Sequence, residues 1–163
     1  MKRILAIICT LIAWGTLGSH DAEAQVCVYR GNSTYSGDII CTVRDGKIYR
    51  KNSSYSGDIL CRINGGRIYS GNSSYSGDIL YNIRDSRLYR GNSSYSGDIV
   101  ANMRNGKLYQ GDSSYSGDII LNKRDNKVYR GNSSYSGDIL YRFDGPLTLP
   151  EFYAVWFVVN YIY

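Results

Sequence analysis

The segment Asn72-Ser73-Ser74-Tyr75-Ser76-Gly77-Asp78-Ile79 decides the fold, because the chain repeats it at a constant spacing of 20 residues. Nearly identical copies begin at Asn32, Asn52, Asn92, Asp112 and Asn132. Repeats of this kind are supersecondary units that bury their apolar faces only against neighbouring copies. The period therefore predicts a single repeat domain over residues 25–163, with six repeat units in residues 28–147.

Each unit has two segments of strand character, a short one such as Lys47–Arg50 and a longer one such as Asp78–Ile83. Between them, pairs such as Asp45-Gly46 are typical of a two-residue hairpin turn. The Gly-Asn-Ser-Ser-Tyr-Ser-Gly segment suits a longer turn held by side chain to backbone hydrogen bonds. A helix is excluded within the repeats, because Gly and Ser recur too often and no 3.6-residue stripe is present. The sequence predicts an all-β domain of about twelve strands.

Strict alternation predicts which face of each strand is buried. Pairing around Asp45-Gly46 places Ile39, Cys41 and Val43 together on the core face. The same alternation makes Leu60 and its equivalents point outward. The outer face also carries polar side chains, and we expect it to be mixed and wettable. Its polar residues are Thr42, Arg62, Asn82, Asn102, Asn122 and Arg142.

The two ends of the repeat array complement each other. An open solenoid needs atypical terminal repeats, yet the first and last loops match the middle ones. The strand near Val28 can pair with the strand that ends at Phe143, which would remove both exposed edges. We therefore predict a shallow, closed, pseudosymmetric barrel. A ring of twelve strands is too wide to be filled by its own side chains, since roughly eight strands leave just enough room for them.

The segment after Asp144-Gly145 breaks the repeat and is suited to fill the ring. Thr148 and Glu151 have the spacing of a capping box, and Pro150 falls in the first turn. Residues 152–159 are apolar all round, which is typical of a buried helix. Their β-branched and aromatic content also fits a last strand, but the cap favours a helix over about 148–161. The predicted core plug is Phe152, Val155, Trp156 and Val159.

The repeat, its Asp-Gly hairpins and the tail Glu151-Phe152-x-Ala154-Val155-Trp156 resemble the bacterial β-flower family, usually called four-fold β-flower proteins. The resemblance covers residues 28–163 and implies a barrel of hairpin petals with an apolar centre. It implies no activity. This chain has six copies rather than four. Twelve strands around an apolar helix also look like the tubby-like barrel, in architecture only.

Residues 1–24 have the pattern of a secretory signal peptide. Lys2 and Arg3 precede an apolar run from Ile4 to Leu17, and Ala22-Glu23-Ala24 offers a cleavage site. An uncleaved anchor is the alternative. No Cys has a lipoprotein-type context. We expect an exported protein, secreted or held in the periplasm or cell envelope.

The composition leaves little chemistry for catalysis. The sole His is His20, inside the predicted signal, and Glu151 is the only Glu after residue 24. Nucleophilic catalysis therefore lacks its usual base, and we expect no enzyme activity and no cofactor. The aspartates of the repeats could suggest calcium, but one carboxylate per unit spreads the oxygens around a ring, so turn capping is favoured. These aspartates are Asp38, Asp58, Asp78, Asp98, Asp118 and Asp138.

Three cysteines follow the predicted signal. Cys41 and Cys61 hold the same slot with one strand between them, so about 9.6 Å separates their strands, beyond disulfide reach. Cys27 falls on the opposite face from Cys41. We therefore predict no structural disulfide.

Two features suggest a binding surface. The net charge of +5 is spread evenly, which argues against nucleic acid but permits an anionic membrane surface, a glycan or another envelope protein. The basic hairpin tips would form a rim able to meet anionic headgroups, although solvated tips explain them too. The rim residues are Arg44, Lys47, Arg84, Arg87, Arg104, Lys107, Arg124 and Lys127.

The repeated tyrosines are the second feature. Six of them fall in loops, at Tyr35 and at each 20-residue step to Tyr135. They could stack on sugars, or each could pack over the outward aliphatic side chain of its own unit, such as Leu60 or Leu80. The sequence thus favours a non-enzymatic binding module at the cell envelope, with a structural or protein-interaction scaffold as the alternative.

Overall fold

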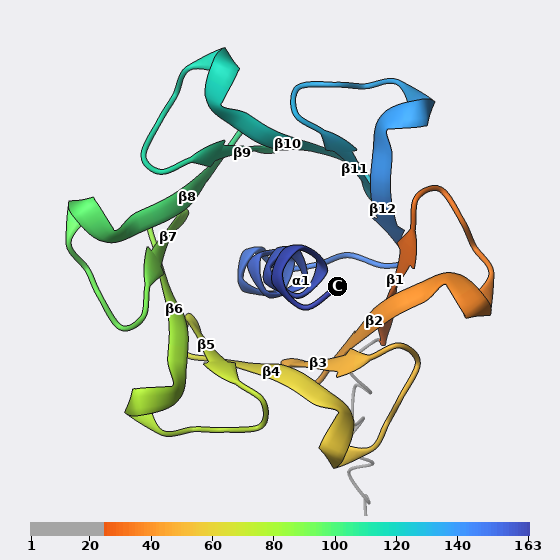
Figure 1. Ribbon diagram of the computed structural model, residues 1–163, viewed down its shortest axis with the longest axis horizontal. Coiled ribbons are helices and arrows are strands. Elements are labelled where there is room, and N and C mark those ends of the chain that lie inside the picture. The colour runs from red at the N-terminus through yellow and green to blue at the C-terminus, as the bar shows by residue number, and fades with distance from the viewer. Residues whose placement is uncertain (1–24) are drawn as a thin grey trace, which may run out of the picture.

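The computed structural model describes residues 25–163; the predicted signal, residues 1–24, lies outside the described residues. Twelve strands, β1 to β12, form one closed antiparallel barrel, and one helix, α1, follows them. The strands are β1 Val26–Arg30, β2 Ile39–Arg44, β3 Lys47–Arg50, β4 Ile59–Asn64, β5 Arg67–Ser70, β6 Ile79–Arg84, β7 Arg87–Arg90, β8 Ile99–Arg104, β9 Lys107–Gln110, β10 Ile119–Arg124, β11 Lys127–Arg130 and β12 Ile139–Phe143. Figure 1 shows six loops projecting from the barrel wall like petals, with α1 inside the ring.

The barrel closes where the sequence predicts. β1 pairs with β12 in the register Val28 to Phe143. Asp144 fastens this seam: its carboxylate accepts a hydrogen bond from the Cys27 amide at 2.7 Å and another from the Tyr29 hydroxyl at 3.1 Å. The seam therefore replaces the covalent turn that joins the two strands in the other five hairpins.

The hairpin turns have the backbone that their sequences predict. Asp45 and Gly46 have φ angles of 51° and 64°, both in the left-handed region required by a type I′ turn. Arg44 and Lys47 face each other across this turn. All five turns lie at one end of the barrel, which we call the hairpin end. The petal loops leave from the other end, the loop end.

The predicted alternation is wrong at the start of each long strand. A β-bulge falls there in every unit, so that Tyr49 pairs with Ile59 while Ile48 pairs with Cys61. The bulge shifts the face by one residue. Leu60 and its equivalents therefore pack against the core, and Ile39 faces outward opposite Tyr29. The predictions for Cys41 and Val43, which lie beyond the bulge, are confirmed.

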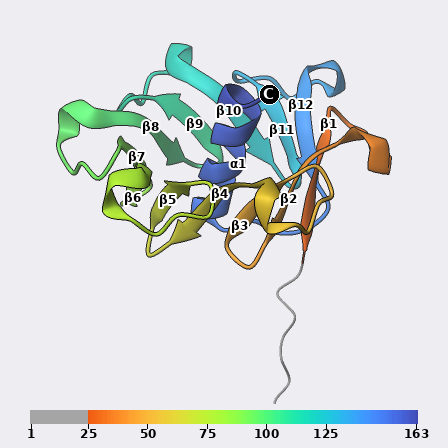
Figure 2. The same cartoon turned by 60° about the horizontal axis from the view of Figure 1, so that its bottom comes forward.

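α1, Leu149–Tyr161, runs along the barrel axis (Figure 2). Its predicted capping box is present, with the Glu151 amide donating to Thr148 Oγ1 and the Glu151 carboxylate accepting from the Thr148 amide. The helix begins at the hairpin end, where Leu149 and Phe152 lie near Gly106. It ends at the loop end, beside Gln110. The core forms between the helix and the inner face of the strands.

The outer face of the barrel is covered, contrary to the expected wettable surface. Each petal folds back over it, and buried polar side chains hold the petal in place. Asn82 Nδ2 donates to the Ser93 carbonyl at 2.9 Å, and Thr42 Oγ1 donates to the Lys51 carbonyl at 2.7 Å. Asn102 and Asn122 are buried and make equivalent bonds to the petals that begin at Gly111 and Gly131. Arg62 and Arg142 are half-buried at the same position. Strand and petal therefore form two layers, and the polar outer residues lie between them.

Candidate binding surfaces

Each petal is held by one hydrogen-bond pattern. In the first petal, Ser33 Oγ accepts from the Tyr35 amide at 3.1 Å and donates to Asp38 Oδ2 at 2.6 Å. The Asp38 amide donates in turn to the Tyr35 carbonyl at 3.0 Å. The same three bonds recur in the other five petals. The repeated aspartates thus brace the petal turn, and the described residues include no cluster of potential metal ligands.

The loop tyrosines do not pack over Leu60 or Leu80, because the bulge turns those leucines into the core. All six are exposed, at 77% to 79% of their surface. The strand tyrosines differ, since Tyr49, Tyr69 and Tyr89 are buried. Six equivalent aromatic rings therefore stand in solvent on six equivalent petals. The tyrosines are Tyr35, Tyr55, Tyr75, Tyr95, Tyr115 and Tyr135.

The predicted basic rim is assembled at the hairpin end, but several of its charges are engaged within the protein. The Arg44 guanidinium lies 4.7 Å from the centre of the Tyr49 ring. Arg84 and Arg124 are exposed, and they make no ion pair within residues 25–163. Lys47, Lys107 and Lys127 are half-buried. Lys123, directly opposite Val128 in the register, places its ammonium 5.6 Å from the centre of the Phe143 ring.

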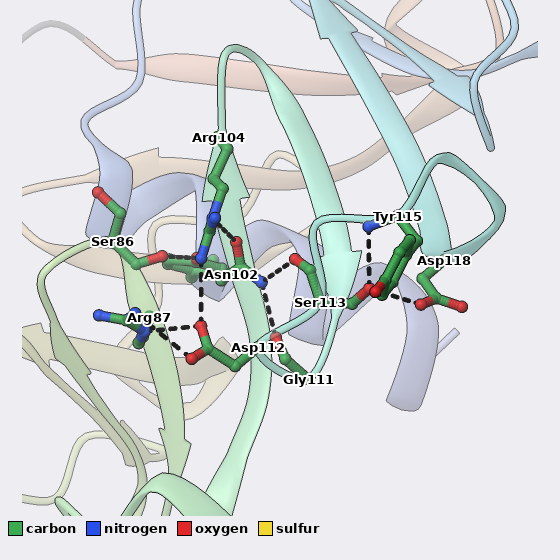
Figure 3. A network of polar contacts seen from close by, with 10 residues as sticks. Ser86, Arg87, Asn102, Arg104, Gly111, Asp112, Ser113, Tyr115 and Asp118 are labelled. Atoms are coloured by element: carbon green, nitrogen blue, oxygen red, sulfur yellow. Dashed lines mark hydrogen bonds and ion pairs between the residues drawn. The ribbon is translucent and has the colours of Figure 1, made fainter.

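Two rim arginines converge on one petal (Figure 3). Asp112, which replaces the Asn of the other units, accepts from Arg87 Nε at 2.8 Å and Arg104 Nη2 at 3.4 Å. Arg104 Nε also donates to Asn102 Oδ1 at 2.9 Å. The hydrogen bond from Arg87 lowers the pKa of Asp112 and raises the pKa of Arg87. In the preceding unit, Arg67 bonds the neutral Asn92 in the same way. These arginines brace petals against hairpins.

A second ring of polar residues, which sequence reasoning missed, lies at the loop end. Arg50 sits directly opposite Cys41 in the register, so it belongs to the inner face of its strand. Burial raises the pKa of Tyr163, and the positive charge of Arg50 lowers it. Arg50 therefore lies within electrostatic reach of Tyr163. The sequence signal for this ring is the polar residue that follows each strand tyrosine in all six units. We call these residues the mouth ring: Arg30, Arg50, Ser70, Arg90, Gln110 and Arg130.

The plug residues lie in the barrel interior. Phe152, Val155 and Trp156 are buried, whereas Val159 is half-buried near the loop end. The Tyr153 hydroxyl donates to the Ser86 carbonyl at 2.7 Å, which ties the helix to a hairpin turn. No helix within residues 25–163 combines the length and hydropathy needed to cross a membrane.

The three cysteines of the described residues are buried free thiols. Cys41 and Cys61 lie in the core, and Cys27 pairs with Thr42 on the outer face. Burial raises the pKa of Cys61 to about 12 and also raises that of Cys41. Both core thiols are therefore protonated at neutral pH and poor nucleophiles.

A family model described as "6-fold beta flower protein" matches residues 28–156, most of the chain. The expected β-flower resemblance is thereby confirmed, and the six-fold description agrees with the six repeat copies. Comparison with curated proteins and with solved structures gives no match. The tubby-like comparison is accordingly not supported.

Proposed function

The chain belongs to the 6-fold beta flower family, and we propose that it is a non-enzymatic, multivalent glycan-binding module of the cell envelope. Its contact surface is the set of six loop tyrosines. The observation that carries the proposal is their uniform exposure of 77% to 79%, on petals with the same internal hydrogen bonds. An aromatic ring left in solvent with a braced backbone is suited to stacking on the C–H face of a sugar.

Repetition favours a polymeric ligand. Six equivalent sites on one rigid ring turn successive contacts with a repeating polymer into intramolecular events, which can raise avidity by about 10²–10⁴ over a single site. The petal hydroxyls and carboxylates beside each ring supply hydrogen-bond partners for sugar hydroxyls. Export through residues 1–24 would bring the domain to envelope polysaccharides.

A glycan is favoured over a lipid headgroup surface because three of the five arginines of the predicted rim have partners within the protein. Arg87 and Arg104 bind Asp112, and Arg44 lies over Tyr49. Absence of enzyme activity is part of the proposal. It is supported by the lack of histidine after His20 and by the use of Glu151 in the helix cap.

Sedimentation with insoluble bacterial cell-wall polysaccharide tests the proposal. We expect the protein to co-sediment, and expect replacement of all six loop tyrosines by Ala to weaken binding by about 100-fold or more. The matched control replaces the same tyrosines by Phe, which keeps the rings and should keep most of the binding.

A second arm distinguishes a membrane ligand. Vesicles of phosphatidylglycerol and phosphatidylcholine replace the polysaccharide, and Arg84→Ser with Arg124→Ser removes two exposed rim charges. Vesicle binding that this double variant abolishes, without polysaccharide binding, would overturn the glycan proposal in favour of headgroups. Binding to neither would favour a scaffold.

A further inference from the structure

A groove of about 700 Å³ opens near the hairpin end, where the outer face of the barrel meets a petal. It lies between two neighbouring hairpin turns and the petal that begins at Gly131. Asn105 and Asp125 come from the turns, and Asn132 and Ser134 come from the petal. The volume of the groove is within the range of about 300–1,000 Å³ found for small-molecule sites.

The equivalent groove one unit earlier shows why this one is open. There the Arg87 guanidinium donates to both oxygens of the Asp112 carboxylate, from Nε at 2.8 Å and from Nη2 at 3.4 Å. Arg104 Nη2 donates to the same carboxylate at 3.4 Å, so two arginines and one petal carboxylate span the groove (Figure 3). The space left beside Arg87 and Arg104 is about 280 Å³.

Two replacements remove this bridge from the larger groove. Lys107 stands in place of Arg87, and Asn132 stands in place of Asp112. A lysine cannot form the two-pronged contact of a guanidinium, and an asparagine carries no charge to attract it. Lys107 makes no ion pair within residues 25–163. The groove is therefore open at the position that a carboxylate fills one unit earlier.

The basic groups of the groove lack an anion of their own. Arg124, the equivalent of Arg104, is exposed, and neither it nor Asp125 makes an ion pair in the described part of the chain. Lys123 also lines the groove, but its ammonium lies 5.6 Å from the centre of the Phe143 ring. Asp125 is the single acidic residue of the lining, against three basic ones. The charge of the groove therefore favours an anion.

The rest of the wall is suited to a sugar. Tyr129 lines the groove and is half-buried, whereas three other strand tyrosines are buried, so part of its surface is open to a ligand. An aromatic ring can contact the C–H face of a sugar, and the Asn132 amide and the Ser134 hydroxyl can bond its hydroxyls. Ser134 precedes the exposed Tyr135, so the groove adjoins the petal surface.

We infer that this groove binds the carboxylate of an acidic sugar, a uronic acid residue of a glycan. The carboxylate takes the place that Asp112 fills one unit earlier, with the Arg124 guanidinium and the Lys107 ammonium as its donors. Hydrogen bonds between charged partners are stronger than neutral ones. The sugar ring lies against Tyr129. The inference rests on the glycan-binding function proposed above and names the class of sugar.

NMR titration with a matched pair of sugars tests the inference. Methyl glucuronide and methyl glucoside differ at C6, which is a carboxylate in the first and a hydroxymethyl group in the second. At constant ionic strength, we expect the amide signals of Lys107, Arg124 and Asn132 to shift with the glucuronide and not with the glucoside. Inorganic phosphate is the third probe. Phosphate binding as tight as that of the glucuronide would assign the groove to a phosphate-bearing ligand and overturn the inference.

Two pairs of variants locate the binding. Asn132→Asp supplies the missing carboxylate from the protein itself and should abolish the shifts, whereas Asn92→Asp adds the same charge at the equivalent position of another petal and should leave binding unchanged. Lys107→Gln removes one charged hydrogen bond and should weaken binding by about ten-fold or more. Lys127→Gln makes the same change in the next hairpin, outside the groove, and should leave binding unchanged.

No shift with the glucuronide at tens of millimolar, an equal response to the glucoside, or equal effects of the two Asn→Asp variants would overturn the inference. The variant with all six loop tyrosines replaced by Ala keeps every residue of the groove, so the two proposals fail separately. Polysaccharide sedimentation without glucuronide shifts rejects the groove alone. Glucuronide shifts without sedimentation reject the petals alone.

Discussion

The petals and the barrel interior differ in how closely their residues keep to the repeat. Each petal keeps the same Ser, Tyr and Asp with the same three hydrogen bonds, whereas one inner slot holds six side chains of very different volume. This slot contains Cys41, Cys61, Tyr81, Ala101, Leu121 and Tyr141. The petals lie outside the ring and contact solvent and the neighbouring hairpins, which repeat with the same period, so six-fold repetition suits them.

The interior faces a single helix, which has no six-fold symmetry. Small Cys41 and Cys61 lie on β2 and β4, two of the strands that α1 approaches most closely. Tyr81 instead reaches Phe157, with 5.5 Å between ring centroids. The difference teaches that the wall varies where it must fit an asymmetric plug. The stability cost of a substitution in the barrel interior should therefore differ from unit to unit. The cost of a substitution in a petal should be the same in every unit.

Removing the helix should have the largest effect. A chain that ends at Leu147 loses the buried side chains of α1 and leaves a barrel too wide to close on itself. We expect aggregation or failure to fold, measured by circular dichroism and size-exclusion chromatography. In the full chain, Trp14→Phe leaves Trp156 as the only tryptophan. Its fluorescence emission should lie at short wavelength and resist quenching by solutes. A cooperative melt unchanged by the truncation would contradict the plug.

One interior leucine and one petal tyrosine compare the two regions directly. Leu88→Ala opens a cavity at a fully buried site and should lower the free energy of unfolding by about 2–5 kcal/mol. Tyr95→Ala, at 79% exposure, should change it by no more than about 0.5 kcal/mol. Urea unfolding measures both. Similar costs for the two variants would mean that the petals contribute to the core.

The two hydrogen bonds of the petal Ser hydroxyl should contribute the same stability in every unit. Ser93→Ala removes a hydroxyl that donates to Asp98 and accepts from the Tyr95 amide, and should cost about 1 kcal/mol. Ser53→Ala and Ser133→Ala should cost the same within error in thermal unfolding. A spread as wide as that of interior substitutions would show that the petals are not independent of the plug.

One petal has a residue with a side chain at a backbone position that favours glycine. Lys51 has a φ of 50° where the other units have Gly in the left-handed region. Lys51→Gly should raise the free energy of unfolding by about 1 kcal/mol, because a Cβ disfavours this conformation. The control is Lys47→Gly, in a strand, which should destabilise. Destabilisation by Lys51→Gly would mean that the Lys51 side chain makes a contribution larger than the strain.

The Asp112 ion pair should give the smallest effect. Asp112→Asn restores the side chain of the other units, keeps a hydrogen bond like that of Asn92 to Arg67, and should cost about 0.2–1 kcal/mol at pH 7. Because folding lowers the pKa of Asp112, its contribution is complete above the pKa of the unfolded chain and disappears as the pH falls through the folded pKa. The stabilities of the two proteins should therefore converge at acid pH, once the Asp112 carboxyl is protonated in both the folded and the unfolded chain. A difference that persists there would exclude an electrostatic origin.

Local signals in the sequence determined much of this protein. The period of 20 residues gave the number of units, the Asp-Gly pairs gave the hairpins, and Thr148 with Glu151 gave the start of α1. These features depend on residues close in the chain, whose conformational preferences do not need the rest of the fold. Even the closure of β1 on β12 followed from the matching of the two ends.

Tertiary structure decided which side chains face the core at the strand starts. The bulge that turns Leu60 inward has no signal in an alternating pattern, because an extra residue is tolerated only once neighbouring strands and petals are in place. The closer approach of α1 to β2, β4 and β5 likewise depends on where an asymmetric helix lies within a six-fold wall, and no repeat can encode that position.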